Sequence, residues 1–143
     1  MRRIALITTT LAALGLLAAG CGESAEDVSN SEYLLGLLQH SWNGARRSLN
    51  SQKPDLDPLR GVHWMLQRTP RRIQKDYEGS NKQEVLAKLK ALREAYEAEV
   101  VPKLELRGAQ VKLQSGVSLA EVRKAFMALD PQYRQIEAMT APK

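Results

Sequence analysis

Apolar residues recur every three or four positions along most of the chain, which is the spacing of one buried face of an α-helix. Such stripes follow one another from residue 34 to residue 136, with short polar links between them. Their members are Leu34, Leu38, Trp42, Ala45 and Leu49, then Leu59, Val62, Leu66, Ile73 and Tyr77, then Val85, Leu89, Leu92, Tyr96 and Val100, and finally Leu119, Val122, Phe126, Leu129, Tyr133 and Ile136. The pattern predicts an all-α fold, a small antiparallel bundle of three to four helices forming a single domain over 30–143.

Polar residues mark the expected helix starts. Ser or Thr followed three positions later by Glu or Gln is typical of a capping box, and the pairs that fit are Ser29 with Glu32, Ser80 with Gln83, and Ser118 with Glu121. Asp57 is expected to cap the second helix, because Pro58 suits a first turn where its missing N–H costs nothing.

Prolines and one ambiguous segment complicate this arrangement. Pro70 predicts a kink, or a restart capped by Thr69, and Pro131 predicts a second kink. Residues 102–117 alternate like a hairpin around a turn at 107–109 but also suit a helix that continues past Pro102. Because a two-stranded hairpin is marginal on its own, we favour the helix while keeping both interpretations.

The first twenty residues have the order of an export signal. Arg2 and Arg3 precede an apolar run over 4–19 that ends in small residues. The run is too short and too weakly apolar for a membrane span of about 20 strongly apolar residues. We therefore expect residues 1–20 to be a signal peptide outside the fold.

The chain's only cysteine follows this run directly, in Ala18-Ala19-Gly20-Cys21. This stretch resembles the lipobox of bacterial lipoproteins, although Leu17 lies one place earlier than the usual leucine. The resemblance implies cleavage before Cys21, diacylglycerol on its thiol and an acylated amino terminus. An ordinary signal peptide that leaves a free cysteine is the alternative. Residues 21–29 then form the lipid anchor and a flexible acidic tether.

Positive charge is concentrated in one region of a chain whose net charge is +5. Residues 46–75 contain eight Lys and Arg residues but only two acids, Asp55 and Asp57, and the rest of the domain is balanced. On a straight second helix, one side opposite the apolar stripe collects the candidate surface-binding residues Arg60, Trp64, Arg68, Arg71 and Lys75. A tryptophan among arginines suits a lipid headgroup region or an anionic polymer. The alternative is that Trp64 packs against another helix.

Motifs of catalysis or cofactor binding are absent from the sequence. It has no haem-attachment, zinc-ligand, phosphate-loop or nucleophile-elbow pattern. We expect no catalytic residue, metal or cofactor. His40 is predicted to lie on the surface. His63 with Met65 could bind copper or serve a haem, but we favour the interpretation that His63 lies at the edge of the apolar stripe and that Met65 packs in the core.

These observations predict an exported lipoprotein held on a membrane through Cys21, on the outer membrane if the organism has one. Its function would be non-enzymatic binding of an anionic lipid, an envelope polymer or a protein through 46–75, whereas nucleic acid is excluded by export. The alternative function is a ligand-carrying, haem-carrying or enzymatic bundle with a pocket near His63, Met65, Tyr96 and Tyr133.

Overall fold

The computed structural model of the protein describes residues 30–142, and the predicted signal peptide, Cys21 and the tether lie outside them. Most of the described residues form the helices α3 (Ser31–Leu49), α4 (Asp57–Asp76), α5 (Lys82–Glu99) and α6 (Leu119–Thr140). A 3₁₀ turn (Val101–Lys103) and the strands β1 (Leu104–Glu105) and β2 (Lys112–Leu113) lie between α5 and α6. The predicted small all-α bundle is therefore confirmed.

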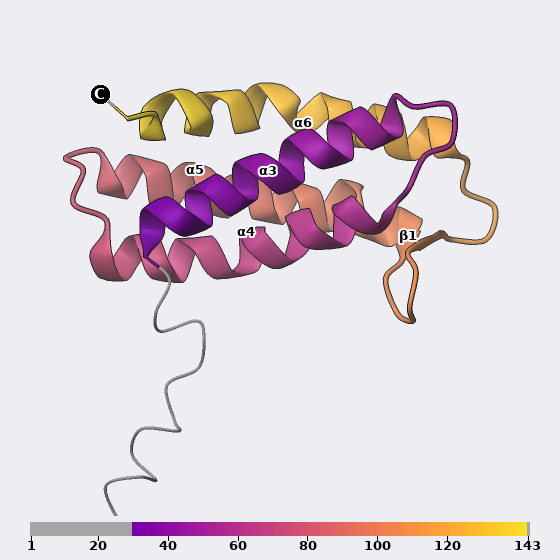
Figure 1. The fold of residues 1–143 in the computed structure, drawn as a ribbon, viewed down its shortest axis with the longest axis horizontal. Helices are drawn as coiled ribbons and strands as arrows, with labels where there is room; N and C mark the ends of the chain where they lie inside the picture. The colour runs from indigo at the N-terminus through magenta and orange to yellow at the C-terminus, as the bar shows by residue number, and fades with distance from the viewer. Residues whose placement is uncertain (1–29, 143) are drawn as a thin grey trace, which may run out of the picture.

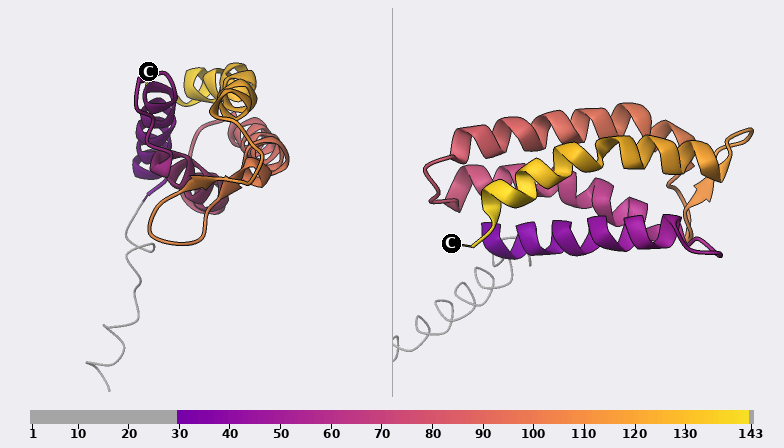
Figure 2. Two further views of the ribbon diagram at one scale, coloured as in Figure 1. Left: turned by 90° about the vertical axis from the view of Figure 1, so that its right-hand side faces the viewer. Right: turned by 90° about the horizontal axis from the view of Figure 1, so that it is seen from above.

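The helices run back and forth along one long axis (Figure 1). Each packs against the next in the chain, and α6 returns beside α3 to close the bundle, as the end view in Figure 2 shows. The start of α3, the α4–α5 loop and the end of α6 share one end of the bundle, and β1 and β2 lie at the other. Residue 30, where the tether is expected to join, is thus at the end opposite the strands.

The four apolar stripes form the core as predicted. Of the stripe residues, only Tyr77 and Leu119 are not buried, because each lies at a helix end. Trp42 is fully buried and stacks on Tyr133, with ring centroids 4.5 Å apart and planes at 14°. Its ring centroid is also 4.6 Å from that of Phe126, so one aromatic cluster joins α3 to α6.

The starts of α3 and α5 differ from those that the sequence predicts. The Ser118–Glu121 capping box is present as predicted. Asn30, not Ser29, caps α3, its Oδ1 accepting a hydrogen bond from the Tyr33 N–H. The Ser80–Gln83 prediction is wrong, because α5 begins at Lys82 after Asn81. The side chain of Asn81 instead accepts from the Tyr77 hydroxyl and donates to the Met139 carbonyl.

The predicted cap at Asp57 is also wrong. Leu56 is the N-cap residue of α4, and Asp57 lies in the first turn. The Asp57 carboxylate accepts a hydrogen bond of 2.7 Å from the Val111 N–H, so it holds the segment between β1 and β2 against the helix. A short-range capping rule could not reveal this partner, which is 54 residues away in the chain.

Neither internal proline breaks its helix. α4 is continuous through Pro70 and α6 through Pro131. Thr69 is fully buried in the middle of α4, so the expected restart capped by Thr69 does not occur. Leu66 and Ile73 are fully buried on either side of the proline, and their packing keeps the helix intact where one backbone hydrogen bond is lost.

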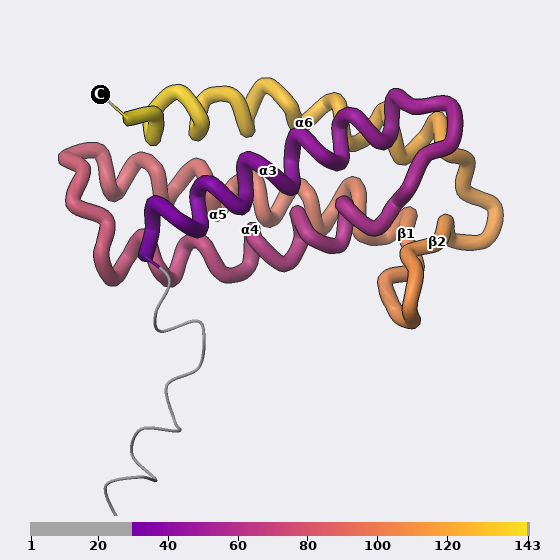
Figure 3. The backbone as a smooth tube through the Cα atoms, in the orientation of Figure 1, coloured from indigo at the N-terminus to yellow at the C-terminus, as the bar shows by residue number. Residues whose placement is uncertain are grey.

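Residues 104–113 form a hairpin, which is one of the two predicted alternatives for 102–117, and the favoured helix is wrong (Figure 3). Leu104 pairs with Leu113 in antiparallel register, and Gly108 has the positive φ of 100° that a tight turn favours. The hairpin is not isolated. Leu104 and Val111 are buried against the bundle, which supplies the stability that two strands lack alone.

Candidate functional site

The basic face of α4, comprising Arg60, Trp64, Arg68, Arg71 and Lys75, lies on the outside of the bundle. Trp64, Arg71 and Lys75 are exposed, while Arg60 and Arg68 are half-buried. Because α4 is continuous through Pro70, residues on both sides of the proline keep their helical spacing. The structure thus brings together the five residues that the sequence grouped.

Trp64 is an exposed aromatic side chain rather than a helix-packing one. It retains 43% of its accessible surface, so the interpretation that it packs against another helix is wrong. The guanidinium carbon of Arg68 lies 3.6 Å from the centroid of the Trp64 ring, which is a cation–π contact between residues one turn apart. This contact orients an indole and a positive charge together at the surface.

Other basic residues of 46–75 point elsewhere. Arg72 is buried and pairs with Asp76 across 3.6 Å, whereas Arg46 lies 3.7 Å from Asp130 of α6. Arg47 and Lys53 are exposed outside α4. The basic segment of the sequence is therefore divided, and only part of it forms a common face.

Arg60 joins the basic face to the hairpin. Its Nη1 donates a hydrogen bond of 3.1 Å to the Gly108 carbonyl, and its Nη2 lies 3.8 Å from Oδ1 of Asp57. Beside it is a hollow of about 300 Å³, lined by Asp57, Arg60, Gly61, Trp64 and Ala109. Sequence reasoning found Arg60 but missed this hollow, which exists because the hairpin folds back toward α4.

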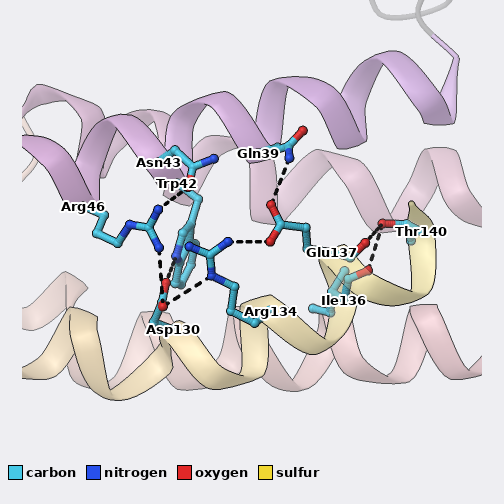
Figure 4. A network of polar contacts seen from close by, with 9 residues as sticks. All are labelled: Gln39, Trp42, Asn43, Arg46, Asp130, Arg134, Ile136, Glu137 and Thr140. Atoms are coloured by element: carbon cyan, nitrogen blue, oxygen red, sulfur yellow. Dashed lines mark hydrogen bonds and ion pairs between the residues drawn. The ribbon is translucent and has the colours of Figure 1, made fainter. Parts of the chain in front are cut away.

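A polar network between α3 and α6 was also missed by sequence reasoning (Figure 4). The indole N–H of Trp42 donates to Oδ1 of Asp130 across 2.8 Å, and Arg46 and Arg134 approach the other oxygen of Asp130. Arg134 also donates to Glu137 at 2.6 Å. The spacing of Asp130, Arg134 and Glu137 indicates a charged helix face, but nothing local identifies the tryptophan 88 residues away.

This network is expected to weaken in acid. Partial burial acts to raise the pKa of Glu137, but hydrogen bonds from Gln39 and Arg134 outweigh it, so this pKa lies below its ordinary value. A carboxylate with a lowered pKa stabilises the folded state above its unfolded pKa of about 4.3, and this stabilisation is lost as the pH falls through the folded pKa. Urea denaturation at pH 7, 5, 4 and 3 should therefore show a shallower acid-induced loss of stability for Glu137→Gln than for wild type. The matched control is Glu84→Gln, an exposed residue of α5, which should follow the wild-type curve; equal curves for all three proteins would contradict the prediction.

The residues of the alternative pocket do not share the larger hollow that the structure describes. This groove, of about 720 Å³, lies between α3, α6 and the α4–α5 loop, and of the four candidates only Tyr133 lines it. Met65 and Tyr96 are buried in the core. His63 is half-buried with Nε2 3.4 Å from Oε1 of Glu97. Within residues 30–142, no three His, Cys, Asp or Glu side chains are placed to hold a metal ion together.

The described residues form a four-helix bundle, and the outward basic face of α4 carries the exposed Trp64. Comparisons with protein-family models, with curated proteins and with solved structures give no match. Across residues 30–142, no helix has both the length and the apolar character needed to span a bilayer.

Proposed function

We propose that this protein is a bacterial envelope lipoprotein, anchored through Cys21, that acts as a non-enzymatic binding module. Its basic face of α4 docks on the anionic lipid headgroups of the membrane that holds it. The observation that carries this proposal is the exposed Trp64 with the Arg68 guanidinium stacked on its ring, in line with Arg71 and Lys75.

The side chains of this face match the chemistry of a headgroup layer. Tryptophan is enriched at membrane–water interfaces, where its ring is partly buried and its N–H stays near polar groups. Each Lys or Arg close to an anionic bilayer adds about 1 kcal/mol of attraction, which salt screens. The four cations of the face are therefore sufficient for measurable, salt-sensitive binding.

The position of the tether is compatible with a bundle that lies flat. Residues 22–29 span at most about 27 Å when extended, and residue 30, the first described residue after them, lies at the end of the bundle where α3 begins and α4 ends. Lys75 is at that end, while Arg60 is about 22 Å further along the helix axis at 1.5 Å per residue. An anchor at one end makes docking of the face an intramolecular step with a high effective concentration.

Vesicle binding tests this proposal. The soluble chain 22–143 keeps the whole core, because the buried stripes lie within residues 30–142. It should bind vesicles of phosphatidylglycerol and phosphatidylcholine in cosedimentation, with affinity falling as NaCl rises from 25 to 300 mM. Arg68→Glu should weaken binding about 10- to 30-fold, since a lost attraction and a new repulsion of about 1 kcal/mol each act together. Trp64→Ala should also weaken it.

A charge reversal on another helix provides the matched control. Lys124 is exposed on α6, and Lys124→Glu changes the net charge by the same amount as Arg68→Glu. This variant should retain near-wild-type affinity. Absence of binding at 25 mM NaCl, an equal loss in both charge reversals, or binding to an anionic polymer without binding to vesicles would each overturn the proposal.

A further inference from the structure

The guanidinium of Arg60 has only part of its hydrogen-bonding capacity in use. Nη1 donates to the Gly108 carbonyl. Nε and Nη2 have no hydrogen-bond partner and are shielded from solvent. The Asp57 oxygen that lies 3.8 Å from Nη2 is beyond hydrogen-bond distance, and it accepts instead from the Val111 N–H at 2.7 Å. Nε–H and Nη2–H of Arg60 therefore make no hydrogen bond, although Asp57 forms an ion pair with the guanidinium.

A charged donor that makes no hydrogen bond and that water does not reach is costly, so such a group is a strong candidate for binding a ligand. Nε–H and Nη2–H lie on the same edge of a guanidinium and point in parallel directions. That edge matches two oxygens of a phosphate group, which arginine binds in a bidentate manner. The Nε–Nη2 edge of Arg60 can therefore donate two parallel hydrogen bonds to one phosphate group.

The surroundings of this edge supply the remaining requirements. The hollow of about 300 Å³ beside Arg60 is lined by the exposed Trp64 and by Ala109 of the hairpin turn, together with Asp57 and Gly61. The turn is held to Arg60 by the hydrogen bond to Gly108, whose positive φ marks a tight backbone bend. Displacement of this turn would open the hollow toward the guanidinium without changing the packed core.

We propose that this hollow between α4 and the hairpin turn is a phosphate-binding subsite, in which Nε–H and Nη2–H of Arg60 bind the phosphate oxygens as the turn at Gly108 and Ala109 moves aside. For a lipid phosphate, the inference rests on the proposed docking of the basic face. The subsite then holds the strand end of the bundle on the bilayer, while the tether holds the opposite end.

The geometry of the donor, rather than its charge, is what the first experiment tests. Arg60→Lys keeps the positive charge but removes the two parallel donors. Arg47→Lys is the matched control, because Arg47 is exposed on α3, outside the basic face. In cosedimentation with phosphatidylglycerol vesicles, Arg60→Lys should bind at least fivefold more weakly than wild type, and Arg47→Lys should bind within twofold of it. Circular dichroism melting should show both variants folded.

Nuclear magnetic resonance tests the same site with a free phosphate. Adding glycerol 3-phosphate to the ¹⁵N-labelled chain 22–143 should shift the Arg60 Nε–Hε signal, the Trp64 indole signal and the Ala109 amide in a saturable manner. Sodium chloride at matched ionic strength should not do so. Shifts with glycerol 3-phosphate and also with vesicles assign the site to phosphate from either source, whereas shifts with vesicles alone assign it to lipid.

The two proposals fail in different ways. Equal vesicle binding by Arg60→Lys and Arg47→Lys, with no selective shift of the Arg60 signal, overturns the subsite and leaves docking by the basic face intact. If the wild-type chain does not bind the vesicles, the docking proposal is overturned. In that case a selective, saturable shift of Arg60 with glycerol 3-phosphate still supports the subsite, and its absence overturns that as well.

Discussion

Replacing Trp42 with alanine is expected to lower the free energy of unfolding by about 3–5 kcal/mol, the usual cost of removing a large aromatic side chain from a core. Trp42 is fully buried and contacts the rings of both Phe126 and Tyr133. Its loss would leave a cavity between α3 and α6 and would also leave Asp130 without the indole donor. For a small domain this is a large fraction of the total stability.

Trp64→Ala is the matched control, because it makes the same chemical change on the surface. The exposed Trp64 contacts Arg68, and its removal should cost less than about 1 kcal/mol. Urea denaturation followed by circular dichroism measures both variants, since each retains only one of the two tryptophans and fluorescence would not be comparable. Similar losses in the two variants would contradict the central position of Trp42 in the core.

Replacing Cys21 with serine is expected to release the protein from the membrane fraction. Two or more acyl chains give stable anchoring, because each buried methylene contributes about 0.8 kcal/mol, which far exceeds what the basic face can supply. Cell fractionation with a high-salt wash should leave the wild type in the membrane pellet and the Cys21→Ser chain in the supernatant. Ser24→Ala, in the same segment, should behave as wild type.

Mass spectrometry of the N-terminal peptide provides the direct chemical measurement. It should find a mature chain that begins at a diacylglyceryl-modified, acylated Cys21. An unmodified cysteine, or a mature chain that begins elsewhere, would contradict the anchor. A wild-type protein that the salt wash removes would show that surface charge alone holds it.

The candidate surface was only partly predictable from the sequence. The common side of Arg60, Trp64, Arg68, Arg71 and Lys75 follows from 3.6 residues per turn, and the contact of Arg68 with Trp64 follows from their spacing of four. The hollow beside Arg60 does not follow from either rule, because its other wall, Ala109, belongs to a hairpin far along the chain. Arg72 and Arg46 do not belong to the exposed basic face, because in the folded bundle they are withdrawn from solvent and lie close to Asp76 and Asp130.

By itself, the sequence determined the helical stripes, the Ser118 cap and the outward side of α4, because each depends on residues within one or two helical turns of one another. The tertiary structure decided the hairpin, the start of α5, the role of Asp57 and the Trp42–Asp130 contact. In each of these cases, a polar group hydrogen-bonds to, or a short strand packs against, residues that are distant in the sequence. Local propensity gives way at such points because a buried group gains more from a distant hydrogen bond or from core packing than from a cap.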